Sequence, residues 1–449
     1  MSARALAEQI CRTLGAHGNR AYLVGGCVRD ILLKREPVDY DVATDATPDQ
    51  VQRIFPGSLG VGAQFGVVIV TERGTGPTEA NEGAQVEVAT FRSDVGYSDG
   101  RHPDKVIYAK SPEEDVRRRD FTINALLLDP ESGKVLDYVG GRQDLEAGII
   151  RAIGAPEKRF GEDKLRMLRA VRFAARFHYV IDAGTFGAIV KMSPEIHQVS
   201  AERVRDEVTK LLTEGAARRG FELLDETKLL PEVLPEVARM KGVQQPAEFH
   251  PEGDVWMHTL MMLEGLPVNC SPTLAWGVLL HDVGKPATFR SATQTGDRIR
   301  FDEHVEVGVR LAETICRRLR FSNDDTKQIM ALVSNHMRFK DVTRMKTSTL
   351  KRFARLELFP EHLELHRLDC LSSHGSLDAY NFVQKFLSET PPEAVRPARL
   401  ISGEDLKNLG FRPGPFFKGI LEAVEEAQLS GQIATRDEAL AFVQREFQE

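Results

Sequence analysis

The sequence predicts an α+β protein with a mixed head followed by helical domains, and three observations support this prediction. Short β-rich runs alternate with helical segments over roughly the first 140 residues. Past residue 150, apolar residues recur at helical spacing and strand signals almost vanish. The chain has 449 residues, which is too long for one hydrophobic core and predicts two to four domains.

The head is expected to consist of short strands that alternate with helices. A Gly- and Glu-rich connection over 72–84 is expected to be an exposed loop between two of the strands. In chain order, we expect an amphipathic helix over 3–17, a strand in AYLV before a glycine turn, a short helix in VRDILLK, and strands in DYDVAT, 66–70 and 85–91.

The remainder is expected to be helical throughout. EDKLRMLRAVRFAARF (162–177) and two later segments have helical spacing, a second all-helical unit contains most of the histidines, and a Pro-containing linker at 391–397 precedes a last helical segment. These changes of pattern predict a head over 1–150, a helical neck over 151–240, a helical domain over 241–390 and a helical tail over 391–449.

The composition is that of a globular protein. Hydrophobic residues make up 42% of the chain, and the net charge of -7 gives no overall basic field, although clustered Lys and Arg can still bind a polyanion. The five cysteines are scattered without a CxxC pair, which argues against a zinc ribbon or a disulfide framework and favours a reducing cytoplasm. We expect neither a signal peptide nor a membrane span, because no apolar run reaches the ~18 residues that a membrane helix needs.

Two carboxylates one residue apart predict a metal site in the head. Asp39 and Asp41 would point to the same face of a strand, where their like charges repel unless a divalent cation lies between them. Mg²⁺ prefers such hard oxygen ligands, and a pair of Mg²⁺ ions can activate an attacking hydroxyl and neutralise a leaving pyrophosphate. Glu87, on a later strand, is the best-placed third acid.

The residues before this pair suit a triphosphate. Gly25 and Gly26 would let backbone amides approach phosphate oxygens, and Arg29 would add a cation. An exposed strand end beside an ordinary glycine turn is the alternative interpretation of these residues.

A second pair of side chains suits a nucleobase. Asp163 and Arg166 are three residues apart, so on a helix they would share a face. Asp accepts from an exocyclic amine and Arg donates to a ring acceptor, so the pair would accept cytosine and adenine while rejecting uracil and guanine. An ordinary surface ion pair is the alternative. Arg169, Arg172 and Arg176 continue the helix and are expected either to form a cationic stripe toward phosphates or to be a solvated face.

The motifs resemble those of a known family. LVGGCVRD followed by DYDVAT resembles motif A of the class II tRNA nucleotidyltransferase and bacterial poly(A) polymerase family, within the polymerase-β nucleotidyltransferase superfamily. RRRDFTINAL (117–126) resembles motif B, which implies that Arg119, Asp120 and Asn124 contact the ribose. Segments 137–151, 162–177 and 200–207 resemble motifs C, D and E in order.

The resemblance covers roughly residues 20–240 and implies a function for them. It identifies Asp163 and Arg166 as the template that selects CTP and ATP. It implies a polymerase-β-type head that adds C, C and A to the 3′ end of tRNA without a nucleic-acid template and releases pyrophosphate, using Mg²⁺. A bacterial poly(A) polymerase is the alternative, although the basic pair typical of the proteobacterial form is absent from GVGAQFGVVIV. Enzymes that add only CC or only A also share these motifs.

The histidines of the second helical unit resemble the HD phosphohydrolase superfamily. Lys285 in HDVGKP would lie near a bound phosphate, and imidazole with carboxylate suits Mn, Fe, Ni or Zn better than Mg. The resemblance implies phosphatase or 2′,3′-cyclic phosphodiesterase activity on RNA ends or nucleotides; a fold retained only to shape the RNA-binding body is the alternative. The implied ligands are His258, His281, Asp282, His304, His336 and Asp369, whereas His250, His362, His366 and His374 are expected to be surface or structural residues.

Two further functions stay open from other classes of protein. The chain could be chiefly an HD phosphohydrolase whose head binds RNA, but the intact DYD and EDxxR argue against this. A non-catalytic RNA chaperone would predict a broken pair of aspartates, and the pair is present. The tail segment LGFRPGPFFKGIL is expected to contact RNA backbone or to pack against the helical body. The sequence predicts no oligomeric state.

Overall fold

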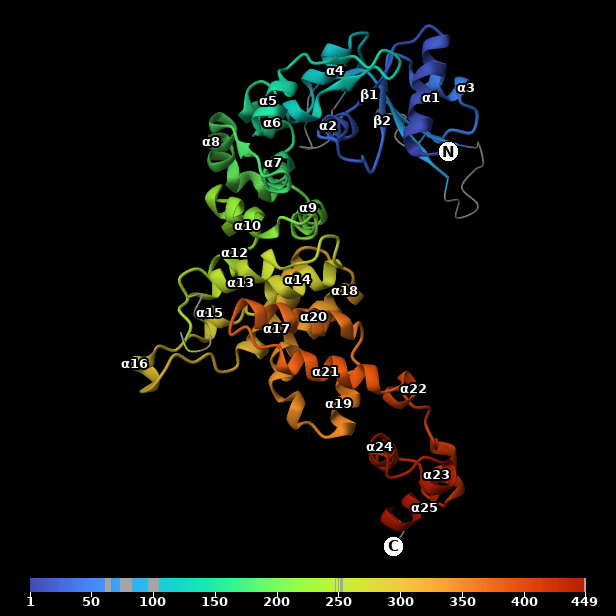
Figure 1. Cartoon of the computed structure of the whole chain (residues 1–449), viewed down its shortest axis with the longest axis vertical. Coiled ribbons are helices and arrows are strands. Elements are labelled where there is room, and N and C mark those ends of the chain that lie inside the picture. Colours follow the sequence, from blue (N-terminus) through green and yellow to red (C-terminus); the bar gives the residue numbers. More distant parts are fainter. Residues whose placement is uncertain are drawn as a thin grey trace. The chain divides into compact units, whose positions relative to one another are not determined.

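The computed structural model describes residues 1–60, 66–72, 83–95, 105–246, 248, 250 and 253–447. Most of the expected loop over 72–84 lies outside the described residues. The chain divides into two compact units, Met1–Ala238 and Arg239–Glu449. The first contains a mixed sheet with helices and the second is helical, which confirms the predicted α+β class (Figure 1).

A six-stranded sheet forms the base of the head in the order β3-β4-β2-β1-β7-β8. Strands β2 and β4 pair in parallel, and the other neighbours pair antiparallel. The predicted strands are all present. The strands of this sheet are β1 (Ala21–Val24), β2 (Asp41–Thr44), β3 (Val67–Thr71), β4 (Gln85–Thr90), β7 (Leu127–Leu128) and β8 (Val135–Leu136).

Helix α1 (Ala3–Ala16) covers one face of this sheet. Ser2 caps its first turn by accepting a hydrogen bond from the Ala5 backbone amide. Ile10 and Leu14 are fully buried at helical spacing, and each such burial contributes about 1.5–3 kcal/mol. The other elements of the head are α2 (Gly26–Leu32), α3 (Pro48–Ile54), α4 (Pro112–Arg117), η2 (Thr122–Asn124) and the hairpin of β5 (Arg92–Val95) and β6 (Lys105–Tyr108).

Helices follow the sheet to the end of the first unit. The prediction of one helix over 162–177 is wrong, because the backbone at Asp163 is extended, with φ -151° and ψ 107°, and the Asp163 carboxylate accepts from the Leu165 amide to start a new helix. The elements are α5 (Gly141–Ala147), β9 (Ile149–Ile150), α6 (Pro156–Glu162), α7 (Leu165–Phe177), β10 (Val180–Ile181), α8 (Ala183–Met192), η3 (Ser193–Gln198), α9 (Ala201–Thr213), α10 (Ala217–Glu226), α11 (Leu229–Val233) and α12 (Pro235–Ala238).

The second unit is built around helix α14 (Pro272–Leu280). This helix is apolar on all sides and buried from Thr273 to Leu280, as expected of a central helix. A Cβ on Gly277 would lie 2.6 Å from the Leu332 side chain, so glycine permits the close approach of α18. Around it lie α13 (Val255–Glu264), α15 (Lys285–Thr288), α16 (Ala292–Thr295), α17 (His304–Arg318), α18 (Asn323–Asn335), η4 (His336–Arg344), α19 (Thr347–Phe353), α20 (Phe359–Ser372), α21 (Asp378–Glu389) and α22 (Pro392–Val395).

The C-terminal helices α23 (Gly403–Asn408), α24 (Phe416–Leu429) and α25 (Arg436–Phe447) enclose a small core of their own. Their contact with α19 is largely polar. Arg352 pairs with Glu426, and Arg355 pairs with Glu425 at 2.6 Å. Glu425 and Glu426 follow the segment LGFRPGPFFKGIL (409–421), so the expectation for that segment stays a prediction.

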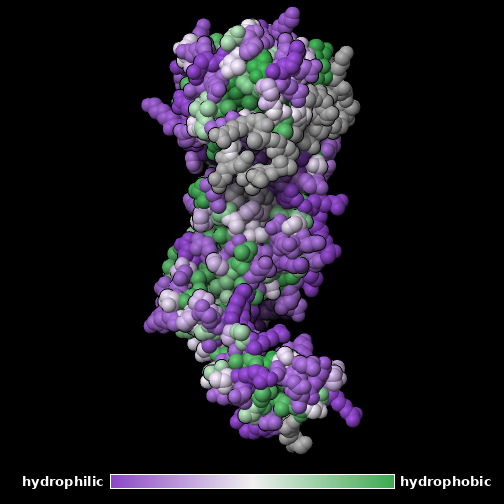
Figure 2. All heavy atoms as spheres, turned by 90° about the vertical axis from the view of Figure 1, so that its right-hand side faces the viewer, coloured by the Kyte–Doolittle hydropathy of each residue, from purple (hydrophilic) through white to green (hydrophobic). Residues whose placement is uncertain are grey.

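The surface is mostly polar. The face drawn in Figure 2 is largely hydrophilic, with hydrophobic side chains in small groups between polar ones. Over the described ranges, no helix combines the length and the hydropathy that crossing a membrane requires.

Candidate active sites in the two units

Two acids on adjacent strands form the centre of the site in the head. Asp41, the first residue of β2, is in register with Glu87 on the parallel strand β4, so the two side chains extend from the same face of the sheet. Burial raises the pKa of Asp41 to about 6, and the charges of Glu87 and Asp39 add to this shift against the opposing charge of Arg119. Glu87 and Asp39 therefore both act on Asp41. Asp39 is exposed and lies before β2, so the prediction that it shares a strand face with Asp41 is wrong. Among the described residues, some sets of three have ligand atoms that all lie within 4.8 Å of one another. Asp39, Asp41 and Glu87 do not form such a set.

The glycine turn approaches these acids closely. Gly25 has φ +80°, and a Cβ there would lie 3.5 Å from Arg119 Nη1 and 3.9 Å from Asp41 Oδ2. Arg119 donates to Asp115 at 3.0 Å and keeps its other edge beside the turn. Backbone of the turn, a carboxylate and a guanidinium thus lie together where the sequence predicts a triphosphate.

A chain of buried hydrogen bonds runs beneath the turn. Arg29 donates to Asn124 Oδ1 at 2.6 Å, and Asn124 donates to Asp120 Oδ1 at 3.3 Å. Arg169 donates twice to Asp120 Oδ2, at 2.9 and 2.7 Å. Burial acts to raise the pKa of Asp120, but the charges of Arg169 and Arg166 outweigh it and the pKa is lowered. The structure thus brings four predicted nucleotide-binding residues into one network that joins α2, η2 and α7.

The Arg29 side chain is more buried than expected of a cation that is free to bind a phosphate. It is 5% exposed, pairs with Asp30 at 2.9 Å and lies 4.6 Å from the centroid of the Phe177 ring. Gly26 leaves room for its guanidinium, since a Cβ there would lie 3.5 Å from Arg29 Nη2. Its contacts hold the turn to the rest of the head.

Asp163 and Arg166 each have a separate partner. Asp163 accepts two hydrogen bonds from Arg203, at 3.2 and 2.7 Å. Arg166 donates to Glu162 Oε2 at 2.8 Å. The premise that Asp163 and Arg166 share a face of one helix is wrong, because Asp163 lies in the break between α6 and α7. Arg203 was not predicted; it is distant in sequence, and only its place in the segment that resembles motif E could have indicated it.

Arginines of α7 form ion pairs with two glutamates, one on α9 and one directly after its last residue. Arg172 is 6% exposed and pairs with Glu207 at 2.7 Å and with Glu214 at 3.1 Å. Arg176 lies 3.6 Å from Glu214. The expected open cationic stripe is therefore absent at Arg172, since both sides of its guanidinium are occupied by acids. Glu207 and Glu214 are further residues that the spacing did not predict.

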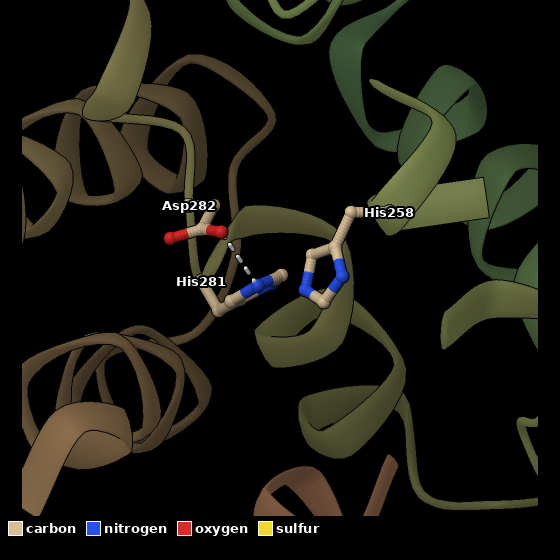
Figure 3. Close-up of side chains that lie close together, drawn as sticks. All are labelled: His258, His281 and Asp282. Atoms are coloured by element: carbon tan, nitrogen blue, oxygen red, sulfur yellow. Dashed lines mark ion pairs between the residues drawn. The ribbon is translucent and has the colours of Figure 1, made fainter. Parts of the chain in front are cut away.

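The six ligands expected in the second unit come together from five segments of the chain. His281 and Asp282 directly follow α14, and their Nε2 and Oδ2 atoms are 3.1 Å apart (Figure 3). His258 of α13 lies on the other side of His281, and its Nε2 is 3.2 Å from Asp369 Oδ1. His304 and His336 each place Nε2 3.8 Å from Asp282 Oδ1.

A glycine brings His304 to this site. A Cβ on Gly284 would lie 2.1 Å from the carbonyl oxygen of His304 and 2.6 Å from the backbone nitrogen of Gly308. Only a residue without a Cβ lets the turn after Asp282 touch the start of α17. The sequence therefore positions His304 through the glycine of HDVG.

Three imidazoles are oriented by backbone carbonyls. Nδ1 of His281, His304 and His336 donates to the carbonyl oxygens of residues three positions earlier, at 2.8, 2.9 and 2.7 Å. Burial lowers the pKa of His304, and it lowers that of His336 to about 4, so both rings are neutral at pH 7. Their Nε2 lone pairs therefore face the Asp282 carboxylate. Within the described part of the chain, the three Nε2 atoms have no hydrogen-bond partner.

These lone pairs fit a metal. Two sets of donor atoms lie within 4.8 Å of one another, His258–His281–Asp282 and Asp282–His304–His336. A cation between them would relieve the cost of burying acceptors that face each other, and imidazole with carboxylate suits a divalent transition metal. Burial opposes ionisation of Asp282, but the neighbouring His281 and Lys285 hold its pKa well below the usual value, so the carboxylate is ionised.

A cavity of about 860 Å³ opens beside these ligands. Its wall includes Lys285 and the exposed cations Arg298, Arg300 and Lys340. His250, His366 and His374, which were expected to be surface or structural residues, also line it. Their spacing gave no sign of this, although His366 is on α20 with the expected ligand Asp369 and His374 follows shortly after that helix.

The Lys285 amine has two close partners. Its Nζ donates to Asp282 Oδ2 at 2.7 Å and to Gln245 Oε1 at 2.6 Å. Lys285 also lines the cavity, so its expected place near a bound phosphate stays a prediction, while its amine lies against a carboxylate. Gln245 was not predicted from the sequence.

Three known protein families match segments that together make up most of the chain. The poly A polymerase head domain matches residues 21–151, the probable RNA and SrmB-binding site of polymerase A matches 178–241, and the HD domain matches 254–372. A CCA-adding enzyme of Geobacillus sp. (strain WCH70) is 32% identical over 434 residues, which is 96% of this chain and 94% of that protein.

Solved structures agree in fold. The Bacillus stearothermophilus CCA-adding enzyme in complex with CTP aligns with a TM-score of 0.74 at 27% identity, covering 99% of this chain and 98% of that one. The Thermotoga maritima CCA-adding enzyme complexed with tRNA_CCA aligns with a TM-score of 0.59 at 19% identity, covering 99% and 95%, which shows likeness of fold alone.

Proposed function

This chain belongs to the family of CCA-adding enzymes, which are tRNA nucleotidyltransferases, and we propose that it adds C, C and A to the 3′ end of tRNA from CTP and ATP. The observation that supports this most strongly is the register of Asp41 with Glu87 beside the Gly25 turn. The relatives bound to CTP and to tRNA_CCA support the same substrates.

Asp39, Asp41 and Glu87 would hold Mg²⁺, which would supply charge neutralisation for attack by the RNA 3′-hydroxyl on the α-phosphate. The protein's own part is to hold the Asp41 carboxylate in place on β2. Because the pKa of Asp41 is about 6, its carboxylate is mostly charged at pH 7. The Gly25 turn and Arg119 would orient the triphosphate, and no side-chain nucleophile is required.

Asp120 and Asn124 would orient the ribose. Both are buried, and Arg29 and Arg169 hold them from opposite ends of the hydrogen-bonded network. Arg29 and Arg169 would therefore contribute to nucleotide binding by holding Asn124 and Asp120. Arg172 would act through its partner Glu207, which also lies 3.9 Å from Arg169.

Asp163 and Arg166 would select the base. Asp163 would accept from the exocyclic amine of cytosine or adenine, and Arg166 would donate to the adjacent ring nitrogen. Their separate partners, Arg203 and Glu162, hold each side chain before a nucleotide arrives. UTP and GTP present the opposite pattern and would leave buried polar groups unpaired, which rejects them.

A poly(A) polymerase is the second candidate, and the names of the two matching families of the first unit favour it. Incubation with Mg²⁺ and tRNAs that end before CCA, after C and after CC, each with a single nucleotide, separates the two. Stepwise addition of C, C and A to tRNA is the expected result. Long A tails on an unstructured RNA would identify a poly(A) polymerase, and arrest after CC, or addition of A alone, would identify a partial CCA enzyme.

The second unit is proposed to be a metal-dependent phosphohydrolase. His258, His281, Asp282, His304, His336 and Asp369 would hold one or two ions of Mn, Fe, Ni or Zn, which would supply hydroxide near neutral pH. The cations around the cavity suit an RNA end or nucleotide with a phosphomonoester or a 2′,3′-cyclic phosphate. Changing His281 and Asp282 to Ala should abolish hydrolysis and spare extension, and changing Asp39 and Asp41 should do the reverse. Loss of both activities from either change would contradict two separate sites.

A further inference from the structure

A buried lysine contacts one of the proposed metal ligands, Asp282. Lys285 is 7% exposed, and its Nζ lies 5.4 Å from the centroid of the Phe301 ring. It donates to Asp282 Oδ2 and to Gln245 Oε1. These contacts occupy the ammonium group and hold it against the Asp282 carboxylate.

The two oxygens of Asp282 face different partners. Oδ2 lies beside Lys285, whereas Oδ1 lies 3.8 Å from Nε2 of both His304 and His336. Because the ammonium is hydrogen-bonded to Oδ2, rotation of the carboxylate would break that bond. Lys285 therefore fixes which oxygen is presented to the two imidazoles.

Gln245 is in turn fixed by the start of helix α13. The Val255 amide donates to the Val243 carbonyl at 3.0 Å, and the Gly242 amide donates to Asp254 Oδ2 at 2.6 Å. The other oxygen of Asp254 caps α13, the helix that carries His258, by accepting from Met257 N at 2.8 Å. The segment that carries Gln245 is thus anchored to a ligand-bearing helix.

The Gln245 side chain is placed for one interaction. It is 5% exposed, and its Nε2 has no hydrogen-bond partner anywhere in the described ranges. Burying an amide with one end unpartnered opposes folding. The Gln245 side-chain oxygen accepts its hydrogen bond from Lys285.

We propose that Gln245 is a positioning residue of the second site: it holds Lys285 on Asp282, so that the opposite carboxylate oxygen stays turned toward His304 and His336 to bind a divalent transition metal. The inference rests on the proposed metal-dependent function of this unit. Partners that orient metal ligands in this way typically affect metal affinity by about 10–100-fold.

Calorimetric titration with Mn²⁺ tests the proposal in the full chain carrying Asp39→Ala and Asp41→Ala, so that the proposed metal site of the head does not contribute. Gln245→Leu removes the acceptor, and Lys285→Met removes the donor. Each should weaken Mn²⁺ binding about tenfold or more. The double variant should be no weaker than the single ones, because both act through one bond. Gln245→Glu keeps an acceptor and should retain affinity, and Gln244→Leu, at the exposed neighbouring position, is the matched control.

The remaining outcomes would overturn either the positioning role or the proposed metal-dependent function. Unchanged affinity in Gln245→Leu, an equal loss in Gln244→Leu, or additive losses in the double variant would overturn the positioning role. Absence of Mn²⁺ binding by the chain that carries only the two head substitutions would overturn the proposed function of the second unit, and the inference with it. If thermal unfolding shows that Gln245→Leu does not fold, Lys285→Met and Gln245→Glu decide: unchanged affinity in the first, or a tenfold loss in the second, would overturn the role of Gln245.

Discussion

Asp41 and Glu87 lie directly opposite each other on the parallel strands β2 and β4. Their repulsion adds to the burial that raises the pKa of Asp41 to about 6. Because the two acids repel each other, they lower the free energy of unfolding of the metal-free protein at neutral pH. Such a conflict is expected at a functional site and not in an ordinary sheet.

Asp41→Asn should therefore abolish extension and stabilise the fold. The pKa of Asp41 is higher in the folded state, so its favourable contribution is present at low pH and is lost as pH rises through about 4 to 6. At pH 7.5 in EDTA, the variant should be more stable by about 1–3 kcal/mol, and the gain should shrink as pH falls toward 4. Denaturant unfolding followed by circular dichroism measures this. A less stable variant at pH 7.5 would contradict the repulsion.

Arg203→Met should relax the choice of base. Arg203 makes two hydrogen bonds to Asp163, and without them the carboxylate is free to turn away from the exocyclic amine. The ratio of kcat/KM for CTP to that for UTP should fall by about 10–100-fold. Lys210→Met, which removes an exposed cation of the same helix, is the control. An unchanged ratio with a lower overall rate would show that Arg203 serves stability alone.

Arg172→Met should destabilise the first unit. It leaves the buried Glu207 without its partner at 2.7 Å, which costs about 3–5 kcal/mol. Arg142→Met, at an exposed position, should stay within about 0.5 kcal/mol of the wild type. Both tryptophans, Trp256 and Trp276, belong to the second unit. Circular dichroism should therefore report an earlier transition that tryptophan fluorescence does not share, and an equal shift in both signals would contradict this assignment.

Asp115 should contribute to the loss of stability in acid. Burial acts to raise its pKa, but the charges of Arg119 and Arg118 outweigh burial and lower it. A carboxyl whose pKa is lower in the folded state contributes stability above its unfolded pKa of about 4, and that stability is lost as pH falls through the folded value. Asp115→Asn should thus be destabilising at pH 7 and progressively less so below pH 4. A difference that is independent of pH would show that packing and not charge is responsible.

The sequence allowed prediction of what lies close along the chain. Asp41 and the Gly25 turn are within one short segment and were predicted correctly, but Asp39 is exposed and lies before β2, so strand alternation does not place it. Glu87 needed the order of the sheet, which alternation alone does not specify.

What could not be predicted depends on contacts between distant segments. Arg203 and Gln245 each lie some 40 residues from the side chains they hold, and no local pattern marks such a pair. The helical spacing of 162–177 did not indicate the break at Asp163, where a local hydrogen bond from the Leu165 amide to the Asp163 carboxylate competes with continuous helix. The lining of the second cavity by His250, His366 and His374 likewise follows from helix packing.

The central claim is that Asp39 and Asp41 hold a divalent ion against a nucleoside triphosphate. Diffraction from crystals soaked with CTP and Mn²⁺, collected at the manganese edge, tests it most directly. The account predicts an anomalous peak between the two aspartates with the triphosphate bound beside Gly25. A triphosphate bound elsewhere, with no peak at these aspartates, would contradict it.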